Sequence, residues 1–202
     1  MQDVIGSVIA LEWKMFDGVQ NINGRASCQD DPHTFEIMRR SQFEAWSAPM
    51  LESYLLDLNE AEQRGENLVA YKYGYMMAYS DPDEFEGIRH MLPEVEEEKK
   101  KLVRDLTDRQ LELHLALGDK YPHLLKQGRP ARMSDENQWD VSLEAYSLGE
   151  LSTYSLRTLR LFEEHLSALD KDGKNFSEMI LSSTVRAYGY PSIDEAERSL
   201  SK

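Results

Sequence analysis

Apolar side chains recur at the spacing of an α-helix along almost the whole chain, and this periodicity limits the fold more than any other feature. Between residues 3 and 17 they form one broad arc on a helical wheel: Val4, Ile5, Val8, Ile9, Leu11, Met15 and Phe16. No segment has the alternating pattern of a strand, and only 11 glycines and 7 prolines interrupt the 202 residues. The sequence therefore predicts an all-α fold, a single domain over residues 1–202 built as a bundle of seven or eight helices.

Capping signals divide this pattern into separate helices. Asp31 followed by Pro32 predicts the N-cap and first residue of a helix that runs to about residue 46. A helix from about Pro49 is ended by Gly65. Further helices are expected at about 67–79, 93–117, 141–170, 175–188 and 192–200, that of 141–170 being the longest. Residues 118–140 form the longest irregular segment.

Charge and composition exclude several classes of protein. The formal net charge of −14 repels phosphate backbones, and no basic stripe with interleaved aromatics compensates it, so nucleic acid is not expected as a partner. The first 13 residues lack a basic start and reach Glu12 after a short apolar run, which fits neither a signal peptide nor a membrane span. A single cysteine fits a reducing compartment. We expect a cytoplasmic protein that does not bind membranes.

Several polar residues lie on the apolar faces of the predicted helices. Burying an unpaired charge costs several kcal/mol, so such residues are expected to be paired, protonated or functional. The residues that meet this test are Glu12, Arg39, Gln42, Arg109, Glu144 and Glu150. One interpretation is a shared polar pocket between facing helices. The alternative is a set of structural ion pairs that holds the helices in register.

The segment "GRASCQDD", residues 24–31, precedes the second helix and concentrates reactive residue types. Asp31 is the expected helix cap, which leaves Asp30 as the freer carboxylate and a candidate acid. Arg25 can offer a fork of donors to an anion. Cys28, close to a helix N-terminus, is a candidate nucleophile, although the two aspartates oppose a thiolate; packing or substrate contact is the alternative.

No strong metal or cofactor motif is present. Di-iron bundles carry Glu-x-x-His pairs, and the five histidines offer none. Phosphate-binding glycine loops and nucleophile elbows are also absent. We expect no cofactor. A Mg²⁺ or Mn²⁺ ion held only by carboxylates, from Glu12, Glu144 and Glu150, is the weaker alternative.

Several segments together resemble the motifs of one protein family. They are "IALEWKMF", "GRASCQDD" continuing into "TFEIMRRSQF", "LESYLLDL", the "GRP" of residues 128–130, "GELSTYS" and "YGYPSIDEAE". The chain resembles the bacterial family catalogued as domain of unknown function 4125 over nearly its whole length. The resemblance implies a small, mostly helical bacterial protein, and it implies no reaction. The family segments contain most of the polar residues that the helical wheels select.

These observations lead to two functional hypotheses. The first is a lyase or hydrolase acting on a small polar metabolite such as an amino acid derivative. Its substrate-binding candidates are Arg25, Arg39, Gln42 and Glu144. Its catalytic candidates are Glu12 or Glu150 as general base, Asp30 as acid, Tyr154 as hydrogen-bond donor, and Cys28. The second hypothesis is a non-enzymatic helical or chaperone-like module that binds a basic peptide or protein, with a fully ion-paired interior and an exposed apolar groove.

Overall fold

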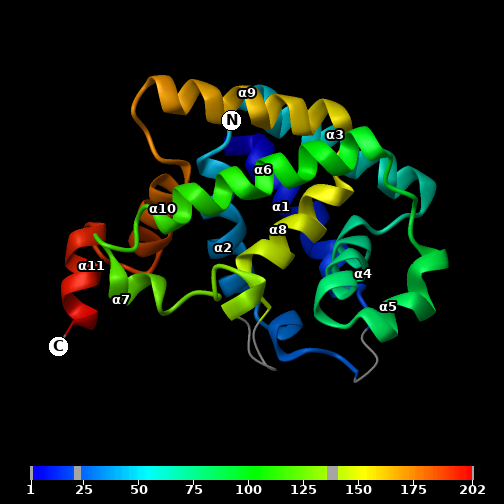
Figure 1. The fold of residues 1–202 in the computed structure, drawn as a ribbon, viewed down its shortest axis with the longest axis horizontal. Helices are drawn as coiled ribbons and strands as arrows, with labels where there is room; N and C mark the ends of the chain where they lie inside the picture. Colours follow the sequence, from blue (N-terminus) through cyan, green and yellow to red (C-terminus); the bar gives the residue numbers. More distant parts are fainter. Residues whose placement is uncertain (1, 21–23, 136–140, 202) are drawn as a thin grey trace.

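The computed structural model describes residues 2–20, 24–135 and 141–201 (Figure 1). These residues form eleven α-helices and three short 3₁₀ turns and contain no β-strand, which confirms the all-α class. The α-helices are α1 (Gln2–Asp17), α2 (Pro32–Glu44), α3 (Ala48–Arg64), α4 (Leu68–Ser80), α5 (Pro82–Ile88), α6 (Glu97–Leu115), α7 (Pro122–Leu125), α8 (Leu143–Thr153), α9 (Leu156–Lys171), α10 (Phe176–Ala187) and α11 (Ile193–Leu200). The turns are η1 (Ser27–Asp30), η2 (Arg89–Met91) and η3 (Met133–Asp135). None of these helices has the length and apolarity needed to cross a bilayer.

The predicted number of seven or eight helices is wrong, because the expected helix over 141–170 is two helices and the short helices α5 and α7 add to the total. Tyr154 has an extended backbone, with φ −75° and ψ 151°, and ends α8. The Ser155 side chain then caps α9 by accepting the Thr158 N–H. Asp57 of α3 accepts hydrogen bonds from the Ser155 N–H and the Thr158 hydroxyl, which ties this break to a neighbouring helix. The short helix α7 also lies within the segment expected to be irregular.

Helix α8 lies in the middle of the molecule (Figure 1). It packs against α4 and α6, while α1 contacts α2, α3 and α4. Five consecutive residues of α8, from Ser147 to Leu151, are buried, so the helix is enclosed on most of its sides. A polar side chain within these five residues therefore lies inside the protein.

The main core joins α1 to α4, α6 and α8 to α10, whereas a smaller cluster occupies one end of the molecule. The smaller cluster consists of Leu117, Tyr121, Val185, Ile193 and Ala196 and joins α7, α10 and α11. Figure 1 shows these three helices at one end and α4 and α5 at the other. The polar groups described next interrupt the main core.

Candidate functional site

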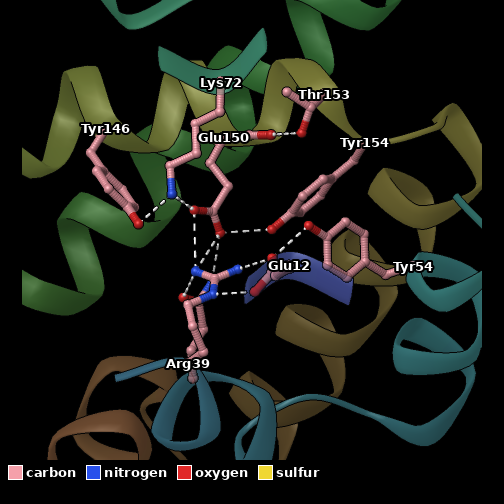
Figure 2. A network of polar contacts seen from close by, with 9 residues as sticks. Glu12, Arg39, Tyr54, Lys72, Tyr146, Glu150, Thr153 and Tyr154 are labelled. Carbon is pink, nitrogen blue, oxygen red and sulfur yellow. Dashed lines mark hydrogen bonds and ion pairs between the residues drawn. The ribbon is translucent and has the colours of Figure 1, made fainter. Parts of the chain in front are cut away.

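The guanidinium group of Arg39 lies between two buried carboxylates (Figure 2). Arg39 Nε and Nη2 donate to Glu12 Oε2 and Oε1 over 2.6 and 2.5 Å. Arg39 Nη1 lies 3.2 and 3.3 Å from the two carboxylate oxygens of Glu150. The relative exposures are 3% for Glu12, 6% for Arg39 and 4% for Glu150, so these charges are shielded from water. A single residue of α2 thus links α1 to α8.

Further donors also bind the two carboxylates. Tyr54 OH donates to Glu12 Oε1 over 2.7 Å. The Glu150 carboxylate accepts from Lys72 Nζ at 2.6 Å, Tyr154 OH at 2.7 Å and Gln42 Nε2 at 2.9 Å. We call Glu12, Arg39, Gln42, Tyr54, Lys72, Tyr146, Glu150 and Tyr154 the buried network. Its two carboxylates balance one guanidinium and one ammonium, which is the condition under which charges persist in a core.

The charges within the buried network shift its pKa values. Burial opposes ionisation of Glu150, but Arg39 and Lys72 outweigh that effect and hold the pKa of Glu150 far below its ordinary value of 4.5. Burial likewise opposes the Lys72 ammonium, yet Glu150 raises the pKa of Lys72 above 10.5. Burial, reinforced by the neighbouring carboxylates, raises the pKa values of Tyr54 and Tyr154 well above 10. Both carboxylate-bound hydroxyls therefore stay protonated at neutral pH, while Glu150 and Lys72 stay charged.

We expect the free energy of unfolding to decrease in acid because of Glu150. Its pKa is lower in the folded than in the unfolded chain, so its contribution is complete above about pH 4.5 and is lost as the pH falls below that value. Urea unfolding at several pH values between about 3 and 7 measures this dependence. Glu150→Gln should be less stable at neutral pH and show a flatter pH dependence, whereas Glu36→Gln, at an exposed position, should keep the wild-type slope. Equal slopes for wild type and Glu150→Gln would contradict the network.

Local packing explains how α4 and α8 bring Lys72 to Glu150. A methyl group at Gly149 would lie 2.7 Å from the main-chain oxygen of Lys72 and would also collide with the Met76 side chain. Only glycine allows the two helices to approach this closely. The close approach places the Lys72 ammonium on the Glu150 carboxylate and beside the Tyr146 hydroxyl.

The structure brings together five of the residues selected from the sequence: Glu12, Arg39, Gln42, Glu150 and Tyr154. Three further members, Tyr54, Lys72 and Tyr146, were missed. Lys72 offered a signal, because it is the only charged residue in the sequence of α4, "LVAYKYGYMMAYS". Tyr54 and Tyr146 offered none, since a tyrosine on an apolar face is ordinary core composition.

The other selected residues lie apart from the buried network. Glu144 accepts the Met133 N–H at 2.9 Å and so fastens η3 to α8. The expectation that Arg109 points inward is wrong: its side chain is 37% exposed and pairs with Glu112 and Asp170. The buried residues of α6 lie on one side of the helix, at positions 103, 106, 107, 111 and 113, and Arg109 lies at the edge of that side.

Residues 24–31 are attached by side-chain hydrogen bonds to the C-terminal end of α1. Arg25 donates to Asp30 at 2.7 Å and to Asp17 at 2.6 Å, and all three side chains are substantially exposed. The buried side chain of Gln29 donates to the Phe16 and Val19 carbonyls. The predicted cap is confirmed, because Asp31 accepts the Thr34 N–H at 2.9 Å. The Cys28 thiol is free and exposed.

The buried network approaches solvent at Tyr146, which is half-buried. Lys72 Nζ contacts the Tyr146 hydroxyl and lies 3.7 Å from the centre of its ring. The exposed guanidinium of Arg129 lies 4.9 Å from the same ring centre. Burial raises the pKa of the adjacent Tyr73, and the positive charge of Lys72 opposes this shift without outweighing it. We call Lys72, Tyr73, Tyr146 and Arg129 the mouth cluster.

The described ranges contain no group of three His, Cys, Asp or Glu side chains that could share a metal ion. The carboxylates proposed for Mg²⁺ or Mn²⁺ are engaged elsewhere, since Glu12 and Glu150 bind Arg39 and Glu144 binds the main chain of η3. A Mg²⁺ or Mn²⁺ ion, the weaker alternative, would have to displace these partners, because a carboxylate site needs free oxygen ligands.

A protein-family model described as "Protein of unknown function (DUF4125)" matches residues 2–198. The chain belongs to this family. The match confirms the resemblance recognised in the sequence and covers every member of the buried network. Neither the curated proteins nor the solved structures contain a match to this DUF4125 chain.

Proposed function

We propose that the chain is an enzyme for a small polar metabolite, of the hydrolase or lyase type, whose reaction centre is the mouth cluster. The observation that carries this proposal is the path from buried Glu150 through Lys72 to the hydroxyl of Tyr146, a residue that is half-buried. Charged groups that are held in a core and lead to a hydroxyl on a partly exposed residue are typical of proton-transfer sites. A core stabilised by apolar packing alone would not require buried charged groups.

Within this proposal Tyr146 is the group that exchanges a proton with the substrate. The Lys72 ammonium beside its hydroxyl stabilises the negative charge that develops on the oxygen as the proton leaves. Because Glu150 raises the pKa of Lys72, this side chain acts as a fixed cation and not as a free amine nucleophile. Glu150 is a positioning residue that fixes the Lys72 ammonium.

The general-base role expected for Glu12 or Glu150 is not part of the proposal. Each carboxylate already accepts several hydrogen bonds, and the lowered pKa of Glu150 makes it a weak base near neutral pH. The acid role expected for Asp30 is left out as well, because its carboxylate pairs with Arg25 at the surface.

One observation favours the second hypothesis, a helical module that binds a basic peptide. Within the described residues, each carboxylate oxygen of Glu12 and Glu150 has a donor, which is the fully ion-paired interior expected of such a module. The net charge of −14 would attract a basic partner.

A thermal-shift screen followed by a turnover assay tests the enzyme proposal. Amino acids, their derivatives, nucleotides and a basic peptide are screened against wild type, Tyr146→Phe and Tyr79→Phe, the last an exposed tyrosine of α4. A ligand at one hundred times its Kd stabilises the folded state by about 2.7 kcal/mol. We expect one metabolite to stabilise the wild type and to be converted, with turnover reduced about 10²- to 10⁴-fold in Tyr146→Phe and unchanged in Tyr79→Phe.

Two outcomes would overturn the enzyme proposal. One is stabilisation by the basic peptide alone, which would support the binding module. The other is conversion of the metabolite at equal rates by wild type and Tyr146→Phe, which would place the reaction elsewhere.

A further inference from the structure

Among the described residues, the guanidinium of Arg129 has one hydrogen-bond acceptor and one ring contact, so most of its donors have no described partner. Arg129 Nη1 donates to the Val141 carbonyl over 3.1 Å, and the group lies 4.9 Å from the centre of the Tyr146 ring. A guanidinium carries five N–H donors. Among the described residues Arg129 has no carboxylate partner. Its ring contact and carbonyl bond hold the side chain in place and leave donors free for a ligand.

The two arginines expected from the sequence to bind an anion are already engaged. Arg39 uses its Nε, Nη1 and Nη2 on Glu12, Gln42 and Glu150 inside the core. Arg25 is bound to Asp17, to Asp30 and to the Gln29 carbonyl. An incoming anion would have to displace these partners, whereas at Arg129 it would displace none of the described carboxylates.

The sequence immediately around Arg129 is basic, and the buried network carries no net charge. The buried network is balanced, since Glu12 and Glu150 offset Arg39 and Lys72. The segment "KQGRPAR", residues 126–132, has three basic residues and no acidic one in a chain with a net charge of −14. An arginine fork binds a carboxylate or phosphate through two parallel hydrogen bonds.

We propose that Arg129 recognises a carboxylate or phosphate group of the substrate and holds it against the hydroxyl of Tyr146. This inference rests on the proposed function, because it takes the mouth cluster as the site, and it narrows the substrate to an anionic metabolite. The shared chemistry is a planar or tetrahedral oxyanion small enough to sit beside one tyrosine ring.

Titration with two probe anions, inorganic phosphate and acetate, tests the inference. Each is titrated separately at constant ionic strength, with chloride as the replaced ion, and the melting temperature is recorded. The proteins are wild type, Arg129→Met, Arg129→Lys and the control Arg132→Met, which removes an exposed charge from the same segment. We expect saturable stabilisation of wild type and Arg132→Met by at least one anion. Its apparent Kd should rise at least tenfold in Arg129→Met and less in Arg129→Lys, which keeps the charge but loses the fork.

The anion that stabilises the wild type distinguishes a phosphate-bearing from a carboxylate-bearing substrate. The inference is overturned if neither anion shows saturable binding, or if Arg129→Met binds as tightly as wild type. A metabolite whose turnover depends on Tyr146 but not on Arg129 would remove this inference and leave the proposed function intact. Anion binding through Arg129 without turnover of any metabolite would remove the proposed function and leave Arg129 only as an anion-binding residue.

Discussion

Replacing Arg39 with methionine is expected to destabilise the folded state by about 3–5 kcal/mol. The substitution keeps much of the side-chain volume but leaves Glu12 and Glu150 with a single buried cation, Lys72. An uncompensated carboxylate in a core has neither water nor a counter-charge, and this cost exceeds the loss of the hydrogen bonds themselves. Urea unfolding followed by far-ultraviolet circular dichroism measures the free energy of unfolding.

Two further variants distinguish the cost of an uncompensated buried charge from a general destabilisation of α2. Arg40→Met removes the neighbouring arginine, whose partner Glu36 is exposed, and should cost at most about 1 kcal/mol. The double variant Glu12→Gln/Arg39→Met restores the balance between Glu150 and Lys72, and it should be more stable than Arg39→Met alone. An Arg39→Met protein within about 1 kcal/mol of wild type would show that Glu12 and Glu150 are not buried as charges.

Members of the buried network were easiest to predict where a charged residue lies on the apolar face of a clearly amphipathic helix. Glu12 lies among apolar residues on a clear amphipathic arc, so its burial could be expected, and Arg39 lies at the edge of the apolar face of α2. Lys72 was not selected in this way, because α4 is apolar around most of its circumference. A helix without a polar face does not show from its sequence which side faces the core.

Contacts between distant segments account for most of the remaining errors. The break after α8 combines a local cap, in which the Ser155 side chain accepts the Thr158 N–H, with hydrogen bonds to Asp57 of α3, and no local pattern reveals that distant partner. The attachment of residues 24–31 to α1 likewise depends on the Gln29 side chain, which donates to the carbonyls of Phe16 and Val19 at and just beyond the end of that helix. Local capping was predictable, as Asp31 shows, because its donor is three residues away.

Gly149→Ala is expected to destabilise the protein by about 1–3 kcal/mol, although alanine is the better helix former. The added methyl group would lie 2.7 Å from the Lys72 carbonyl oxygen, which belongs to the backbone of α4 and cannot rotate away. The two helices must separate, and the separation moves Lys72 away from Glu150, the residue next to the substitution. We therefore expect Gly149→Ala also to reduce turnover of the metabolite identified with the wild type.

Gly6→Ala is the matched control, because a methyl group there meets no atom within 4 Å in the interior of α1. Alanine at that position should stabilise the protein by about 0.5–1 kcal/mol, since it removes backbone freedom from the unfolded chain without a new contact. The same substitution, glycine to alanine, should thus change the free energy of unfolding in opposite directions at the two helical positions. Urea unfolding of both variants measures this difference. If Gly149→Ala were as stable as Gly6→Ala, the α4–α8 contact would be looser than the structure has it, and Lys72 would lose the support that places its ammonium beside Tyr146.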